Sequence, residues 1–179
     1  MSIADGDTAQ QAVEELYRHG HRRIAALISR PNDQSISQLR YEGYVQALES
    51  HGIPVDPELV ISTGGFGAKD AYRAVQEKMA ENVDFTALFA IADSMAIGAM
   101  RALMDAGRRI PEDCSVIAID GLELSAYIEP PLTTLCQPME EMGRRSAEIL
   151  LDMVRHKGSH ACELLPTTLR QGRSVAAPR

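Results

Sequence analysis

The chain has 179 residues, of which 45% are hydrophobic and 24% charged, and its formal net charge at pH 7 is −7. This composition predicts one globular domain, or a large and a small lobe, and the acidic charge argues against direct binding to nucleic acid. The apolar runs are far shorter than the roughly 20 residues of a membrane helix, and no secretory signal pattern is visible, so we expect a cytoplasmic protein without membrane contact.

Helical and strand patterns alternate along the chain. The first helix is predicted to follow Asp7, a residue type that caps helix N-termini, and to stop at Gly20. The strands are short apolar runs without polar alternation, which is typical of parallel strands buried on both faces. This alternation predicts an α/β fold with a parallel sheet and right-handed crossovers. The predicted helices cover residues 8–19, 37–50, 68–81, 94–106 and 139–156, and the predicted strands cover residues 24–28, 59–62, 87–90, 116–119, 133–136, 162–165 and 168–170.

One crossover carries two acidic residues at informative places. The stretch DFTALFAIADSMAIGAMRALMDAGRRIPEDCSVIAID contains a strand, a helix, a glycine stop and a second strand. Asp93 stands at the start of the helix, and Asp120 ends the second strand. Ligands of parallel α/β sheets bind at the carboxyl ends of the strands. The sequence therefore predicts small-molecule binding near these two carboxylates.

The residues that would indicate an enzyme or a metal protein are missing. The sequence contains neither a GxSxG nucleophile turn nor a GxGxxG loop after the first strand, and GGFGAK does not match a GxxxxGK[ST] phosphate loop. Cys114, Cys136 and Cys162 are far apart and form no CxxC pair, so we expect reduced thiols rather than metal ligands or disulfides. An α/β enzyme is the less favoured hypothesis, and we expect no cofactor.

Five segments in order resemble the effector-binding core of the LacI/GalR family of bacterial transcriptional repressors. They are GHRRIAALIS, LRYEGYVQALESHGI, TALFA with MAIGA, IPED with SVI, and PPLTT followed by Gln137. The resemblance implies a periplasmic-binding-protein-like fold of type I, a Rossmann-like lobe with fragments of a second lobe, and a homodimer. It implies a small-molecule effector, a sugar or a purine-like compound. The alternative within the same fold is a periplasmic-type sugar-binding protein.

The resemblance also implies how the chain is divided. Residues 1–21 are expected to close a first lobe, residues 22–136 to form the effector-binding second lobe, and residues 137–179 to form a return segment with terminal strands. The start of the first lobe and the helix-turn-helix headpiece have no counterpart in this sequence. Contact with operator DNA would then belong to that headpiece and not to these residues.

The family's ligand contacts map onto six positions. Arg40, in the LRYEGY segment, implies a guanidinium that hydrogen-bonds the effector at the cleft edge, although a solvated helix arginine is the plainer interpretation of that residue alone. Asp120 implies a carboxylate that accepts ligand hydroxyls or N–H groups, the alternative being a loop cap.

The other positions are carried over more loosely. Phe66 implies an aromatic surface for stacking, Gln137 a polar group facing the cleft, and Asp5 a contact from the other lobe. Asp93 is a candidate contact too, but the preceding position, which often binds ligand in the family, is Ala92. We therefore expect Asp93 to act mainly as the N-cap of its helix.

Overall fold

The computed structural model describes residues 1–29, 35–156 and 163–179. Its centre is a six-stranded sheet with the order β3-β2-β4-β5-β6-β8, in which only β8 runs antiparallel to its neighbour. The predicted α/β fold is confirmed. The strands of this sheet are β2 (Ile24–Ser29), β3 (Val60–Thr63), β4 (Ala87–Ala90), β5 (Ser115–Asp120), β6 (Thr133–Cys136) and β8 (Thr168–Arg170).

The three central strands explain the absence of polar alternation in the sequence. Every residue of β2 and β4 is buried, and so is every residue of β5 except its last, Asp120. Helices cover both faces of the sheet, so both sets of alternating side chains must be apolar. Phe89 and Leu27 are among the largest side chains that are fully buried there.

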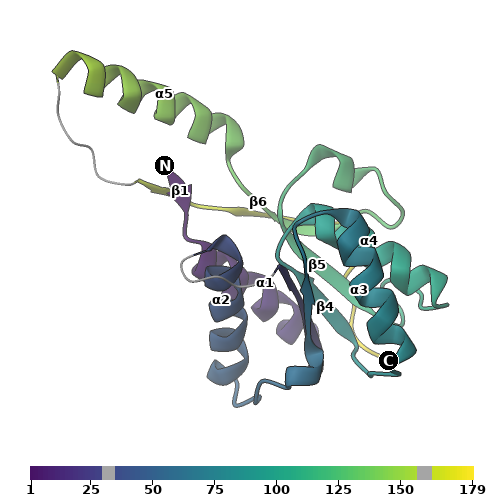
Figure 1. Cartoon of the computed structure of the whole chain (residues 1–179). Helices are drawn as coiled ribbons and strands as arrows, with labels where there is room; N and C mark the ends of the chain where they lie inside the picture. The colour runs from purple at the N-terminus through teal and green to yellow at the C-terminus, as the bar shows by residue number, and fades with distance from the viewer. Residues whose placement is uncertain (30–34, 157–162) are drawn as a thin grey trace.

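Four helices form the two outer layers (Figure 1). Helices α1 (Asp5–Arg18) and α2 (Ile36–Ser50) pack together on one face, and α3 (Ala68–Ala80) and α4 (Asp93–Asp105) pack together on the other. Ser35 caps α2 by accepting a hydrogen bond from the Gln38 N–H at 3.1 Å. Short 3₁₀ helices, η1 (Pro57–Leu59) and η2 (Glu123–Ala126), precede β3 and follow β5.

The start of α1 differs from the prediction. The helix begins at Asp5 and not after Asp7, and its N-cap position is Ala4, which has no side chain able to cap it. Buried α1 side chains such as Val13 and Leu16 join the core of the sheet. The packing therefore joins residues 5–18 to the sheet and its covering helices.

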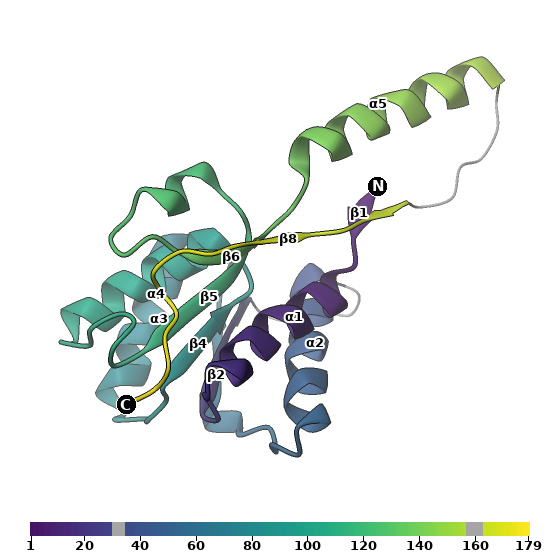
Figure 2. The same cartoon turned by 180° about the vertical axis from the view of Figure 1, so that it is seen from behind.

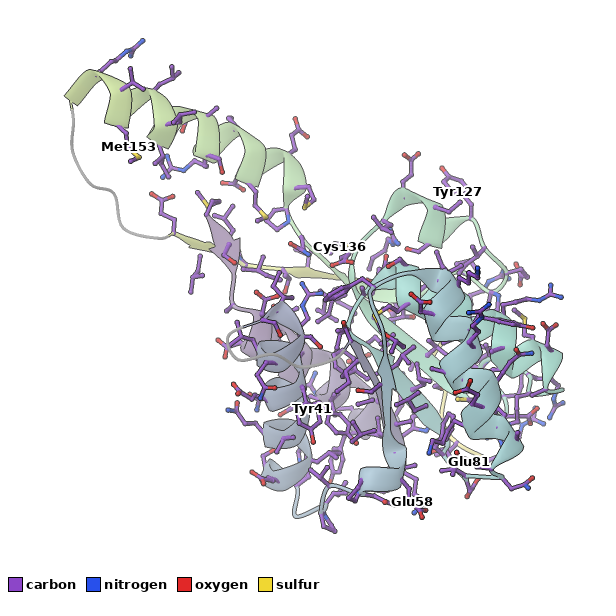
Figure 3. The ribbon with its side chains drawn as sticks, viewed as in Figure 1. Tyr41, Glu58, Glu81, Tyr127, Cys136 and Met153 are labelled. Atoms are coloured by element: carbon purple, nitrogen blue, oxygen red, sulfur yellow. The ribbon has the colours of Figure 1, made fainter. Side chains whose placement is uncertain are left out.

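Three elements extend from the body, as Figures 1 and 2 show from opposite sides. Helix α5 (Met139–His156) follows β6, and the strands β1 (Ser2–Ile3) and β7 (Leu164–Leu165) pair with each other in parallel. Apolar α5 side chains such as Leu150, Val154 and Met153 are exposed, and Met153 lies far from the sheet (Figure 3). Arg145 Nη2 of α5 donates to both carboxylate oxygens of Glu163, just before β7, at 2.9 and 2.8 Å.

The segment after β8 returns along the sheet and is bonded to it throughout. The Ser174 hydroxyl accepts from the Thr133 N–H at 2.8 Å and donates to the Val116 carbonyl at 2.6 Å. Ala176 accepts from His21 Nε2 at 2.8 Å, so the segment also reaches the start of β2. Within the described residues, no helix combines the length and apolar character needed to cross a membrane.

The cysteines in the described part of the chain are free thiols. Cys114 is buried, and burial raises the pKa of its thiol to about 12. Burial also raises the pKa of the thiol of Cys136, the last residue of β6 (Figure 3). Such thiols are poor nucleophiles at neutral pH. Cys162, where a strand is predicted to begin, lies outside the described residues.

Candidate functional site

Arg40 lies at the centre of a group of polar side chains at the carboxyl edge of the sheet. Its side chain is on α2, yet the residue is only 3% exposed. Nε donates to Asp5 Oδ1 at 2.8 Å, and Nη1 donates to Asp120 Oδ1 at 3.2 Å and to the carbonyl oxygen of Ile91. A buried guanidinium needs such partners to offset the loss of its hydration. Arg40, which we expected at the edge of a cleft, is therefore also one partner of a buried ion pair.

Asp120 connects this arginine to the segment that follows β6. Its Oδ1 also accepts from Gln137 Nε2 at 2.8 Å, and its side chain is 25% exposed. The backbone of Asp120 has φ of 133°, a region that residues other than glycine seldom adopt and that costs on the order of 1–3 kcal/mol. Strained backbone of this kind persists where surrounding contacts fix it. Here the contacts of the carboxylate provide that restraint.

Four of the six predicted site residues are thus brought together. Asp5 begins α1, Arg40 lies in α2, Asp120 ends β5, and Gln137 follows β6. They are separated by up to 132 positions in the numbering, yet a single guanidinium and a single carboxylate oxygen join them. We call these four side chains the Arg40 cluster.

Asp93 has a different role from the predicted N-cap. The N-cap position of α4 is Ala92, without a side-chain bond, and Asp93 is the first residue of the helix. Its carboxylate is 0% exposed and accepts from the Leu122 N–H at 2.8 Å, Ser125 Oγ at 2.7 Å and Thr134 Oγ1 at 2.6 Å. The N-cap prediction is wrong, because the carboxylate faces the loop after β5 instead of its own helix.

The electrostatics of Asp93 follow from this burial. Loss of hydration raises the pKa of its carboxyl group, the hydrogen bonds from Thr134, Ser125 and Leu122 oppose that change, and the nearby Asp120 adds to it. A fully buried side chain with three protein partners has no surface for a ligand. Its position supports the loop that carries Asp120.

Arg170 also holds the loop after β5, and no sequence pattern predicts this role. From β8 it donates to the carbonyl oxygens of Gly121 at 3.4 Å and Leu122 at 3.0 Å, and to the hydroxyl of Ser125. Ser125 in turn donates to Asp93. No local motif surrounds Arg170, and its partners lie 45 to 49 residues away, so sequence reasoning does not identify it.

Phe66 stands apart from the Arg40 cluster. It lies in the loop between β3 and α3, is 43% exposed, and accepts at its carbonyl oxygen from Ser94 Oγ of α4 at 2.7 Å. That bond fixes the loop beside the first turn of α4. An exposed aromatic ring at the same edge of the sheet can stack on a flat or apolar ligand face.

The candidate site does not coincide with either of two cavities in the structure. A cavity of about 630 Å³ lies between the outer face of α1 and Leu135 and Leu169, and one of about 490 Å³ lies around His21 and Arg108. Neither has a residue of the Arg40 cluster in its lining. Among the described residues, no group of three His, Cys, Asp or Glu side chains could hold a metal ion. The convergence of charged groups identifies the candidate site.

Comparison with known proteins agrees with this fold and places it in a family. The periplasmic binding protein-like domain family matches residues 13–175. The HTH-type transcriptional repressor CytR of Escherichia coli is 39% identical over 163 residues, which make up 88% of this chain and 47% of that protein. The chain thus spans about half the length of this curated relative.

Solved structures give the same result. The transcriptional regulator CelR in complex with cellobiose has a TM-score of 0.88 at 33% identity, covering 97% of this chain and 53% of that one. A dimeric Lac repressor has a TM-score of 0.89 at 30% identity, covering 98% and 64%. Together with the repeated strand-helix architecture, these matches show that the chain belongs to the periplasmic binding protein-like domain family, in the form found in LacI-family transcriptional regulators.

Proposed function

We propose that this chain is the effector-sensing domain of a LacI-type transcriptional regulator, and that a sugar or purine-like molecule binds at the Arg40 cluster. The observation that carries the proposal is the convergence of Asp5, Arg40, Asp120 and Gln137 from four separate parts of the sequence. Asp120 offers a partly exposed carboxylate, and Phe66 offers an exposed ring at the same edge. This combination suits a ligand with hydroxyl groups and an apolar face.

The Arg40 cluster also offers a route from binding to regulation. Asp5 stands where β1 enters α1, and Gln137 stands where β6 leads toward α5, so the cluster joins both segments that leave the body. A ligand that competes for Asp120 would change how firmly these segments are held. Such a ligand shifts the population between two arrangements if it binds one of them more tightly.

The regulator is favoured over a periplasmic-type sugar-binding protein because the sequence relative is an HTH-type transcriptional repressor. Contact with operator DNA in the cytoplasm would belong to a headpiece outside these residues, since this chain is acidic. A homodimer is supported by the solved Lac repressor, which is described as dimeric.

The test is a calorimetric titration of the protein with neutral sugars and nucleosides. Asp120→Asn keeps the shape of the side chain and removes its charge, and it is expected to weaken binding by roughly 10- to 150-fold, the loss of one charged hydrogen bond. Glu58→Gln is the matched control, because Glu58 lies at the other end of the body (Figure 3). Equal affinities of wild type and Asp120→Asn would place the ligand elsewhere.

A further inference from the structure

The backbone of the loop after β5 has a conformation that needs support from its surroundings. Asp120 has φ of 133°, and Gly121, which follows it, has φ of 78°. A strained residue such as Asp120 keeps its conformation only where surrounding contacts fix it. The position of the Asp120 carboxylate therefore depends on the contacts of residues 121–125, and not only on those of the carboxylate itself.

Arg170 of β8 provides charged hydrogen-bond donors to this loop. Its Nη1 donates to the carbonyl oxygen of Gly121 at 3.4 Å, and its Nη2 donates to the carbonyl oxygen of Leu122 at 3.0 Å and to the hydroxyl of Ser125. Within the described residues, no other charged side chain donates to residues 121–125. Hydrogen bonds from charged groups are stronger than those between neutral groups. Arg170 is therefore the strongest donor to the carbonyl groups at the start of the loop.

Leu122 is held at both of its backbone polar groups. Its N–H donates to the buried carboxylate of Asp93 at 2.8 Å, and its carbonyl oxygen accepts from Arg170. The sheet places Arg170 for this role, because it is the partner of Thr134 across β8 and β6, and the Thr134 hydroxyl donates to Asp93 at 2.6 Å. Ser125 links the two charged groups, since its hydroxyl donates to Asp93 and accepts from Arg170. Arg170 and Asp93 thus fix an acceptor and a donor of the same residue.

We propose, on the basis of the sensing function proposed above, that Arg170 is a positioning residue for effector binding. It holds the loop in the conformation that presents the Asp120 carboxylate, and it does so before the effector binds. The contacts of Arg170 are with the loop and not with that carboxylate, so its effect on affinity passes through the loop backbone. Preorganisation of this kind raises affinity, because the effector does not have to order the loop when it binds.

Three substitutions test the role of the guanidinium. Arg170→Met keeps the aliphatic stem and removes every donor, whereas Arg170→Lys keeps the charge and loses the planar set of donors that reaches several acceptors. Arg173→Met is the matched control, because Arg173 lies in the same C-terminal segment, its side chain is 68% exposed, and it pairs with the exposed Glu129 at 2.8 Å.

The first measurement is effector affinity by calorimetry, with a panel of D-ribose, D-glucose, cellobiose, adenosine and guanosine. For each compound that the wild-type protein binds, Arg170→Met is expected to weaken binding by about 10-fold or more, since charged hydrogen bonds to the loop are lost. Arg170→Lys is expected to lie between Arg170→Met and wild type. In an Asp120→Asn background, Arg170→Met is expected to weaken binding by less than about 3-fold, because the two residues act through one interaction. Arg173→Met should leave the affinity unchanged.

The second measurement is hydrogen exchange in the free protein, which needs no ligand. In Arg170→Met, the amides of Leu122 and Ser125 are expected to exchange about 10-fold faster or more, because the loop opens more often. The amides of β4 are expected to exchange as in wild type, since that strand lies in the buried centre of the sheet. This contrast distinguishes local opening of the loop from a loss of global stability.

The outcomes separate the role of Arg170 from the function on which it rests. Weaker binding together with faster exchange at Leu122 supports Arg170 as the positioning residue. Unchanged affinity in Arg170→Met, or an equal loss in the Asp120→Asn background, overturns that role and leaves the sensing function standing. Unchanged exchange at Leu122, or equally faster exchange in β4, overturns it as well. If the wild-type protein binds no compound of the panel, the proposed sensing function fails, and the role of Arg170 in binding fails with it.

Discussion

Gly43 of α2 lies against the carbonyl oxygen of Gly6 in α1, so close that a Cβ atom at residue 43 would overlap it. Gly98 of α4 has the same relationship to the carbonyl oxygen of Ala68 at the start of α3. Both helix pairs thus approach each other through a glycine. The separation of the helices on each face of the sheet is set by these contacts.

Replacing Gly43 or Gly98 with alanine is therefore expected to destabilise the protein by about 1–3 kcal/mol, because backbone must move to accept the methyl group. Gly143→Ala is the control, since a Cβ atom there has no neighbour within 4 Å. Its free energy of unfolding should change by less than about 1 kcal/mol, and alanine favours a helix. Urea unfolding of the three variants measures the difference, and equal stabilities would contradict the close approach.

Arg40→Ala is expected to lower the free energy of unfolding by about 3–5 kcal/mol, because it leaves the buried Asp5 carboxylate without its partner. Arg101→Ala serves as the control, since that side chain is largely exposed and its pair with Asp105 lies on the surface. The control should change stability by at most about 1 kcal/mol. A loss below about 1 kcal/mol for Arg40→Ala, measured in urea, would show that the ion pair is not buried as described.

Ser125→Ala removes the hydroxyl that lies between Asp93 and Arg170. The expected cost is about 1–3 kcal/mol, since a buried carboxylate loses one of its donors. The second readout is ligand affinity, which should fall because the loop that carries Asp120 is less restrained. Ser146→Ala, on the exposed face of α5, tests for a general effect of the substitution. Unchanged affinity in Ser125→Ala would limit Asp93 to a stabilising role.

The stability of the protein is expected to fall as the pH decreases below about 6.5 because of His21. Burial lowers the pKa of this histidine in the folded protein, where the ring contacts Thr86 Oγ1 and the Ala176 carbonyl. The unfolded chain therefore binds the proton more readily, and the stabilising contribution is lost as the pH falls toward the folded pKa. The melting temperature, measured between about pH 8 and about pH 5, should depend less on pH in His21→Gln than in wild type or in His19→Gln.

The sheet can be predicted from the sequence because its signal is local. The apolar runs around Phe89 and Ile117 form strands that are buried on both faces. The glycine and proline residues between these runs indicate where the helix of each crossover ends. The positions of Asp93 and Asp120 are predictable for the same reason, since they stand at the carboxyl ends of these strands. Arg40, Gln137, Asp5 and Phe66 are predicted only from the resemblance to a family.

The burial of the site cannot be predicted in this way. Arg40 is buried only because Asp5 and Asp120 reach it from 35 and 80 residues away, and a helix arginine by itself indicates a solvated side chain. Asp93 stands in the sequence where a helix N-cap is expected, but its carboxylate accepts hydrogen bonds from Ser125 and Thr134 instead of capping α4. Distant partners decide the role of each of these residues.

The route of the segment after β8 has a consequence for how this protein is made. Ser174 bonds to residues 41 and 58 positions earlier, and Ala176 accepts from a histidine 155 positions earlier. During translation, the strands β2 to β6 are synthesised well before residues 168–176. The β6 edge of the sheet therefore stays without its partner strand β8 until those residues have been made. Contacts of such long range are formed slowly. The nascent chain therefore exposes the edge of β6 until translation has passed this segment, which makes that strand a natural point for a chaperone to protect.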